Sequence, residues 1–132
     1  MKQYNIDLAA LALRIALGAM FLAHGFTKLL VFTPAGTAAY FASIGFPGFM
    51  GYLTILFEIG GAILLLFGAF GRVISGLTVI QMIVIAYIHS PNGWSFSNPG
   101  GGWEYPAFMA LAAFALALIG DGRFSIMRLI KK

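Results

Sequence analysis

The chain has 132 residues, of which 61% are hydrophobic and only 9% are charged. A soluble domain carries about 25% charged residues, so this chain cannot cover its own surface with polar groups, and we interpret it as an integral membrane protein. The absence of cysteine excludes disulfides, thiolate metal sites and cysteine-ligated iron–sulfur clusters. The net charge of +4 does not indicate nucleic-acid binding, because the charges lie at the ends of apolar runs and form no patch.

Four apolar segments predict an all-α membrane protein, a four-helix bundle with a single transmembrane domain over residues 1–132. The predicted spans cover residues 8–30, 48–70, 73–89 and 103–119. At about 1.5 Å per residue, the first two cross a hydrocarbon layer of about 30 Å unaided, whereas the last two need their flanking residues. We interpret the first span as a retained helix and not as a signal peptide, because Arg14 and His24 interrupt it and no convincing cleavage site follows.

The connection between the first two spans predicts a short helix of its own. Thr33 is the expected N-cap, and Pro34 suits the first helical position. Gly45 and Pro47 end the segment. We expect this helix to lie in the outer interface of the membrane.

The other two polar segments differ in character. The connection "HSPNGWSFSNPGGGW" is rich in Gly, Pro, Ser and Asn and predicts an irregular loop, whose tryptophans fit an aromatic belt at the headgroup level. The C-terminal stretch "DGRFSIMRLIKK" turns at Asp121 and then becomes a short basic amphipathic segment. We expect this segment to lie on the anionic cytoplasmic leaflet.

The distribution of basic residues predicts the orientation in the membrane. If the spans alternate, only Lys28 lies near one side, and seven basic residues lie at or near the other: Lys2, Arg14, Arg72, Arg123, Arg128, Lys131 and Lys132. Because positive residues remain on the cytoplasmic side, we expect both termini to be cytoplasmic. The expected location is a bacterial-type cytoplasmic (inner) membrane, which the chain crosses several times.

Polar groups inside the first two spans predict a buried site. An ionised residue at mid-bilayer costs about 2.5–3.5 kcal/mol, so it normally faces protein and has a partner. Arg14, His24 and Lys28 fall in one arc of about 120° on the first helix. Glu58, on the antiparallel second helix, lies roughly 4 Å in depth from His24 and roughly 8 Å from Arg14. We therefore expect Glu58 to contact His24 first and Arg14 next.

Glycines beside the carboxylate have an expected role in this pairing. Gly60 and Gly61, with Gly68 further along, would let a neighbouring backbone approach closely. The resulting Glu58 pair has three interpretations that the sequence leaves open. It locks two helices together, it forms a proton-accepting or quinone-binding site, or it serves an interface with another subunit.

Each remaining polar residue also has a structural alternative. Lys28 can extend to the outer headgroups, and Arg14 can act only as a topology determinant near the inner interface. Gln81 on the third span can be an interhelical hydrogen-bond donor, and His89 lies at a span end where water satisfies it. A haem held by His24 and His89 is disfavoured, because the two histidines differ by roughly 9 Å in depth. We expect no metal site.

Four stretches together resemble the DoxX family of small four-helix membrane proteins, over nearly the whole chain. They are "LRIALGAMFLAHGFTKL", "GTAAYFASIGFP", "FEIGGAILLLFGAFGR" and "GGGWEYPAFMALAAFALALIGDGRFSI". The resemblance implies an association with thiosulfate:quinone oxidoreductase, with terminal quinol oxidase complexes or with other membrane oxidoreductase assemblies. The family pattern falls on His24, Lys28, Glu58, Arg72, Glu104 and Tyr105.

These observations predict a small membrane subunit of a quinone-linked oxidoreductase complex. Its quinone or proton site would comprise Arg14, His24, Lys28 and Glu58, with secondary polar positions at Gln81, His89, Glu104 and Tyr105. Histidine and glutamate suit proton exchange with a quinone oxygen, and apolar walls suit an isoprenoid ring and tail. The chain has no flavin or nucleotide fingerprint and no thiol, so any electrons come from a partner subunit or from a bound quinone.

Two other functions remain open at this point. The chain can be a structural or assembly subunit that anchors a catalytic partner and binds no substrate. It can also be a small transporter that uses the charged track along the first helix, although four helices with one short polar arc offer little lumen. No complete catalytic apparatus is present in the sequence, so its standing as an enzyme stays undecided.

Overall fold

The computed structural model describes residues 1–131, and this range is helical with no strands, which confirms the predicted all-α class. Lys132, part of the predicted basic tail, lies outside the described residues. The helices are α1 (Lys2–Phe26), α2 (Pro34–Ser43), α3 (Phe49–Phe67), α4 (Gly71–His89), α5 (Glu104–Ile119) and α6 (Ile126–Ile130). A π-helical turn, η1 (Thr27–Val31), continues α1, and a 3₁₀ turn, η2 (Ser90–Asn92), follows α4.

Three segments are long and apolar enough to cross a membrane, namely residues 2–31, 49–67 and 71–92. The fourth apolar helix, α5, has 16 residues, which gives a length of about 24 Å. This helix therefore needs its flanking residues to cross the bilayer, as the sequence predicts.

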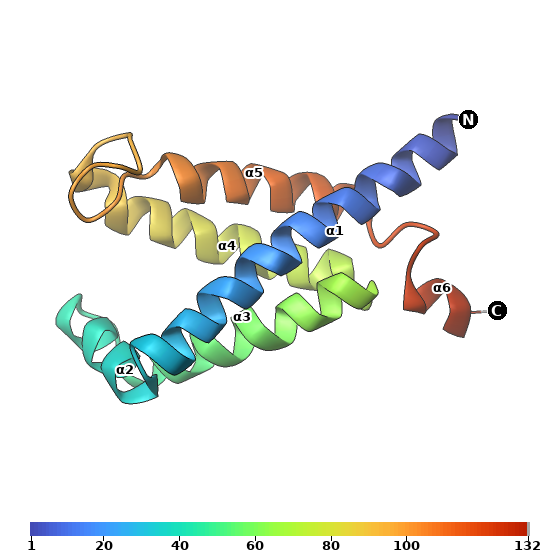
Figure 1. Cartoon of the computed structure of the whole chain (residues 1–132). Helices are drawn as coiled ribbons and strands as arrows, with labels where there is room; N and C mark the ends of the chain where they lie inside the picture. The colour runs from blue at the N-terminus through green and yellow to red at the C-terminus, as the bar shows by residue number, and fades with distance from the viewer. Residues whose placement is uncertain (132) are drawn as a thin grey trace.

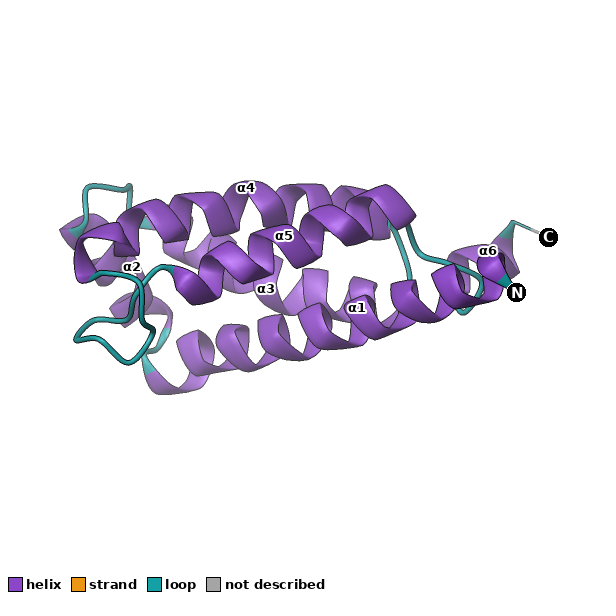
Figure 2. Cartoon of the chain, turned by 90° about the horizontal axis from the view of Figure 1, so that it is seen from above, coloured by secondary structure: helices purple, strands orange, loops and turns teal. Residues whose placement is uncertain are grey.

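The four long helices form two antiparallel pairs. Helix α1 packs mainly on α3, and α4 packs mainly on α5 (Figure 1). Both termini lie at one end of the bundle with the α3–α4 turn, and we call this the terminal end (Figures 1 and 2). The other end carries α2 and the loop before α5, and we call it the loop end. The two pairs lie further apart at the loop end than at the terminal end (Figure 1).

Buried apolar side chains from α1, α3, α4 and α5 form the core: Ala10, Leu17, Phe21, Ala62, Leu65, Ile74, Met82, Met109, Ala113 and Leu116. The core draws on both helix pairs, so it holds them together. Alanines among the core residues let the helix backbones approach each other.

The close contact between α1 and α3 depends on glycines of α1. A Cβ added at Gly25 would lie 2.6 Å from Cγ1 of Ile59, and one at Gly18 would lie 2.8 Å from Cγ of Leu66. The prediction that Gly60 and Gly61 make this contact is wrong. Gly60 has no neighbouring atom within 4 Å of an added Cβ, and Gly61 faces α4. Two residues along a helix turn its face by about 200°, so Gly60 cannot face the helix that Glu58 faces.

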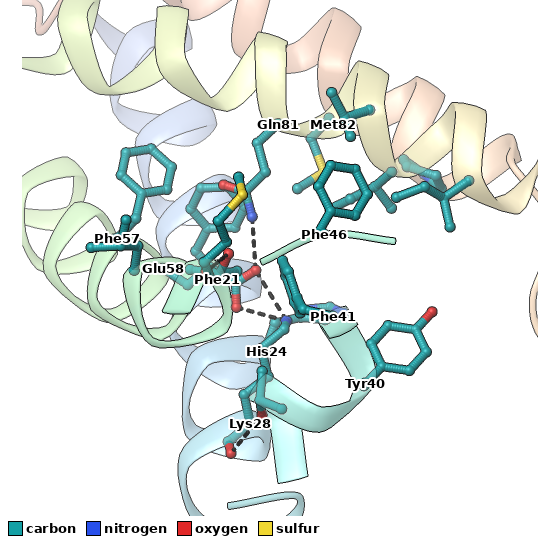
Figure 3. A pocket seen from close by; sticks show the side chains of 18 of the residues that line it. Phe21, His24, Lys28, Tyr40, Phe41, Phe46, Phe57, Glu58, Gln81 and Met82 are labelled. Atoms are coloured by element: carbon teal, nitrogen blue, oxygen red, sulfur yellow. Dashed lines mark hydrogen bonds and ion pairs between the residues drawn. The ribbon is translucent and has the colours of Figure 1, made fainter. Parts of the chain in front are cut away.

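The connection between α1 and α3 folds as the sequence predicts. The Thr33 hydroxyl accepts a hydrogen bond from the Gly36 N–H at 3.2 Å, and Pro34 occupies the first helical position of α2. Helix α2 then packs on α3, where a Cβ added at Gly51 would lie 3.0 Å from the backbone of Ala38. This packing places the face of α2 that carries Tyr40 and Phe41 beside the polar residues of the spans (Figure 3).

Candidate functional site

An ion pair with a buried carboxylate joins η1, the continuation of α1, to α3 at the loop half of the bundle. The Lys28 ammonium donates to both oxygens of Glu58, at 2.8 Å and 3.1 Å. The Gln81 side-chain amide of α4 donates to the same carboxylate at 3.0 Å. The Glu58 side chain is 2% exposed and that of Lys28 is 20% exposed. Figure 3 shows the Glu58 carboxylate between its two donors, Lys28 and Gln81. The three residues come from η1, α3 and α4. A buried charge with this set of donors is compensated.

The prediction that His24 is the nearest partner of Glu58 and Arg14 the next is wrong, because Lys28 forms the ion pair. Side chains on a helix lean toward its N-terminus. In η1, which continues α1, Lys28 therefore leans from the loop end toward the middle of the bundle. On antiparallel α3, Glu58 leans toward the loop end, so the two groups converge. His24 leans away from Glu58, and its Nδ1 lies 2.8 Å from the Met20 carbonyl oxygen. Lys28 does not extend to the outer headgroups.

The π turn at Thr27–Val31 contributes to this geometry. The Phe32 N–H donates to the Thr27 carbonyl at 3.1 Å, five residues back. A π turn inserts one residue into the helix and changes the direction of the residues that follow. Thr37 of α2 closes over the turn, because its hydroxyl is hydrogen-bonded to the carbonyls of Thr33 and Lys28 and the residue is 3% exposed.

His24 and Tyr105 form a second polar group near the ion pair. Their rings stack with centroids 5.7 Å apart and planes inclined by 28°. Because a carbonyl only accepts, the Nδ1 of His24 carries the hydrogen that bonds Met20, and Nε2 of the neutral ring remains an acceptor. The buried Tyr105 hydroxyl has no hydrogen-bond partner among the described residues. This pair therefore offers one acceptor and one donor.

Both polar groups line a partly open cavity of about 910 Å³, whose wall comes from α1 to α5 and the segments between α1 and α3. It brings together six of the eight predicted site residues: His24, Lys28, Glu58, Gln81, His89 and Tyr105. Aromatic and aliphatic side chains form most of the remaining wall, among them Phe21, Tyr40, Phe41, Phe46, Phe57, Met82 and Met109 (Figure 3). The cavity is thus apolar, with polar groups from the spans in its wall.

Arg14 lies outside this cavity, contrary to its predicted place in the site. Its guanidinium donates to the carbonyls of Leu65 and Leu66 at the end of α3, at 2.8 Å and 3.0 Å. It also donates to the carbonyls of Asp121 and Phe124 before α6, both at 2.8 Å. Helix α3 is capped by Gly68 with a φ of 72°, and the Leu65 carbonyl accepts from the Gly68 N–H at 3.1 Å as well as from Arg14. Arg14 therefore joins three chain segments at the terminal end.

Glu104 also lies apart from the cavity, because its carboxylate accepts from the Phe96 N–H at 3.1 Å and holds the loop before α5. In the same loop the rings of Trp94 and Trp103 meet edge to face, with centroids 4.6 Å apart. Arg72 donates to carbonyls at the end of α5, those of Ala117 and Ile119. Glu104 and Arg72 thus hold helix ends in place.

Sequence reasoning missed the contribution of α2 and of Asp7. Nothing in the sequence around Thr37 distinguishes it from an ordinary helical threonine, although it covers Lys28. Asp7 is 5% exposed and accepts hydrogen bonds from the Arg123 N–H at 3.1 Å and from Gln3 at 3.3 Å. The only sequence signal for Asp7 is an acidic residue directly before an apolar span.

The two histidines do not act as a pair. The Nδ1 of His89 lies 2.9 Å from the Ile85 carbonyl, so each histidine is hydrogen-bonded within its own helix. Within residues 1–131 no group of three or more histidine, aspartate or glutamate side chains could hold a metal ion. The chemistry that this arrangement offers is therefore hydrogen bonding and proton exchange at the wall of an apolar cavity.

Comparison with known proteins gives a match to the DoxX family over residues 9–91. The chain is 30% identical over 128 residues to "Inner membrane protein YqjF" of Escherichia coli (strain K12), which covers 96% of this chain and 95% of the relative. It is 31% identical over 120 residues to "Putative oxidoreductase CatD" of Bacillus subtilis (strain 168), covering 89% and 83% respectively. No solved structure gives a significant match.

Proposed function

Since this chain belongs to the DoxX family, we propose that it is a small subunit of a quinone-linked oxidoreductase complex in a bacterial inner membrane. The names of its two relatives, "Inner membrane protein YqjF" and "Putative oxidoreductase CatD", support this location and reaction class. The observation that carries the proposal is the apolar cavity whose wall holds the Glu58–Lys28–Gln81 cluster.

The residues of the cavity fit a quinone. Its volume of about 910 Å³ lies within the ~300–1,000 Å³ range of small-molecule sites. Aromatic and aliphatic walls suit a quinone ring and its isoprenoid tail. The Tyr105 hydroxyl, buried and without a partner in the described chain, can donate to a quinone carbonyl. Lys28 and Glu58 carry opposite charges, so the cluster favours an uncharged ligand.

The proton chemistry would lie with side chains of this chain. A bound quinone supplies an acceptor for two electrons and two protons. Tyr105 would donate a hydrogen bond to a carbonyl oxygen, and the Nε2 of His24, stacked on Tyr105, would first accept a proton from water and then pass it to that oxygen as the quinone is reduced. Glu58 balances Lys28, and Gln81 fixes the orientation of the carboxylate. In the proposed complex, a cofactor of a partner subunit would supply the electrons.

Retention of quinone by the purified protein tests the binding site. Tyr105→Phe removes only the hydroxyl, and Tyr87→Phe is the matched control because Tyr87 is 80% exposed and lies outside the cavity wall. We expect Tyr105→Phe to lower the quinone retained per protein by about five- to tenfold, the equivalent of one hydrogen bond. Equal retention by the two variants, or none by the unaltered protein, would contradict the site.

A second measurement tests the role as a subunit. In Glu58→Gln and His24→Ala, the yield of complex in a pulldown and the quinone reduced per assembled complex are measured together. We expect normal assembly with lost quinone reduction, since neither residue belongs to the apolar core. Normal turnover in both variants would overturn the proposal. Loss of the partner itself would favour a purely structural subunit.

A further inference from the structure

A second cavity lies at the terminal end of the bundle, whereas the ion pair lies in the loop half. It has a volume of about 410 Å³, and we call it the basic cleft. Its lining comes from α1, from the end of α3 and from the segment around α6: Leu11, Arg14, Leu66, Phe67, Arg123, Phe124, Ser125, Ile126 and Leu129. None of these residues takes part in the proposed quinone site, so the cleft is open to a separate function.

The basic cleft has two arginines and no acidic residue in its lining. Within residues 1–131, neither Arg14 nor Arg123 forms an ion pair with a carboxylate. The carboxylate of Asp121 accepts from the Gly71 N–H instead. Arg14 is 1% exposed and gives four of its five N–H groups to carbonyls, and the Asp121 carboxylate acts on its charge from beyond ion-pair distance. Arginine guanidinium groups match the geometry of a phosphate and favour an anion beside them.

Arg123 is arranged to receive such an anion. Its guanidinium lies 5.7 Å from the centroid of the Tyr4 ring and 5.3 Å from that of Phe124. Aromatic faces position a guanidinium without neutralising it. The Arg123 N–H donates to buried Asp7, which fixes the backbone at this residue. Two positive groups, one buried and one exposed, therefore border the same cleft.

Apolar residues make up the rest of the cleft and continue onto its rim. Phe67 is 63% exposed, Leu129 is 69% exposed and Ile126 is 40% exposed. Such exposure is stable where lipid chains replace water. An inorganic ion would gain nothing from these side chains, whereas a molecule that joins an anion to a hydrocarbon chain would contact both parts of the cleft.

We propose that the basic cleft binds one anionic phospholipid, with its phosphate beside Arg123 and Arg14 and an acyl chain along Leu66, Phe67 and Leu129. Bound lipid would then join α1, α3 and the α6 segment, the same three parts that Arg14 connects. The predicted orientation places this end in the cytoplasmic leaflet, where anionic lipids are available to basic segments. The site is independent of the proposed quinone site.

Native mass spectrometry of the full chain, purified in mild detergent with phosphatidylglycerol or phosphatidylcholine added, tests the proposal. Arg123→Gln lies in the cleft, and Arg128→Gln removes the same charge from α6 outside the cleft lining. We expect Arg123→Gln to lower retention of phosphatidylglycerol by about fivefold relative to Arg128→Gln. This factor corresponds to the contribution of one basic residue to the binding of an anionic lipid. Equal losses in both variants would show a diffuse charge effect and overturn the site.

The apolar half has its own matched pair of variants. Leu129→Asn alters the cleft, while Ile130→Asn alters the neighbouring residue of α6, which is 72% exposed and outside the lining. We expect only Leu129→Asn to weaken lipid retention. Inorganic phosphate, added in excess, should not displace the lipid. Displacement by phosphate, or retention of phosphatidylcholine equal to that of phosphatidylglycerol, would contradict a phospholipid site.

Discussion

The ion pair of Lys28 and Glu58 offsets the desolvation cost of placing each charge in the interior of the bundle. Both carboxylate oxygens are occupied, one of them by Lys28 and Gln81 together. Breaking such a pair costs more than its formation contributes, because the remaining charge stays buried without a partner. The pair is therefore expected to be sensitive to the loss of one member and tolerant of the loss of both.

Glu58→Ala should destabilise the protein by about 3 kcal/mol or more, because it leaves the Lys28 ammonium unpaired. Glu58→Gln should be milder, since an amide oxygen still accepts a hydrogen bond. The double variant Lys28→Met with Glu58→Leu should be more stable than Glu58→Ala. Thermal unfolding in detergent measures all three. An unchanged midpoint in Glu58→Ala would show that the pair carries little free energy.

The candidate site could be predicted from the sequence only in part. A charged residue in an apolar span must face protein, which places Glu58 and Lys28 inside the bundle. The partner of each charge could not be derived, because counting depth at a fixed rise per residue assumes a regular α-helix. That count neglects the lean of side chains and the π turn after Phe26. The sequence misplaces Arg14 for another reason: its partners are carbonyls at the end of α3 and before α6, and sequence patterns do not show where such carbonyls lie.

At the scale of helices, the approach of α1 to α3 sets the distance between the two charges. Gly25 lies on α1, one helical turn before Lys28, and its Cα faces Ile59 and Glu58. Any side chain at this position must push the two helices apart or displace Ile59. Helix packing and the ion pair are therefore linked through one glycine.

Gly25→Ala should cost about 1–3 kcal/mol, because the added Cβ would overlap Ile59. The control is Gly60→Ala on α3, where an added Cβ has no neighbour within 4 Å. That control should raise stability by about 0.5–1 kcal/mol, because alanine restricts the unfolded chain. Unfolding midpoints of the two variants give the comparison. Equal midpoints would mean that the helices do not approach as closely as Gly25 indicates.

At the scale of the whole molecule, composition and hydropathy were sufficient for the helical architecture. The apolar runs are long, and their ends coincide with Pro, Gly or charged residues, so element type follows from the sequence. The splayed arrangement of the two helix pairs could not be predicted in this way. It depends on which small residues meet, and neighbouring glycines such as Gly60 and Gly61 differ completely in their surroundings.

Both termini lie at one end, so a single labelling experiment can decide the orientation in the membrane. We expect Ser97→Cys to react with an impermeant thiol reagent on intact cells and Lys131→Cys to react only after permeabilisation. Both side chains are exposed, and the chain has no native cysteine. The reverse pattern would place the termini outside and would move the basic cleft to the other leaflet.

The depth of Glu58 has an electrical consequence. It is the tenth of the 19 residues of α3, so in a bilayer that α3 spans its carboxylate would lie near the middle of the electric field. The field does little work on the pair as a whole, because its two charges are opposite and adjacent. A proton that reaches Glu58 from the loop end crosses roughly half of the voltage drop, which is worth about 1 kcal/mol per 100 mV. With the loop end outside, the resting potential of a cell draws protons toward this carboxylate, and a cell that loses its potential loses that bias.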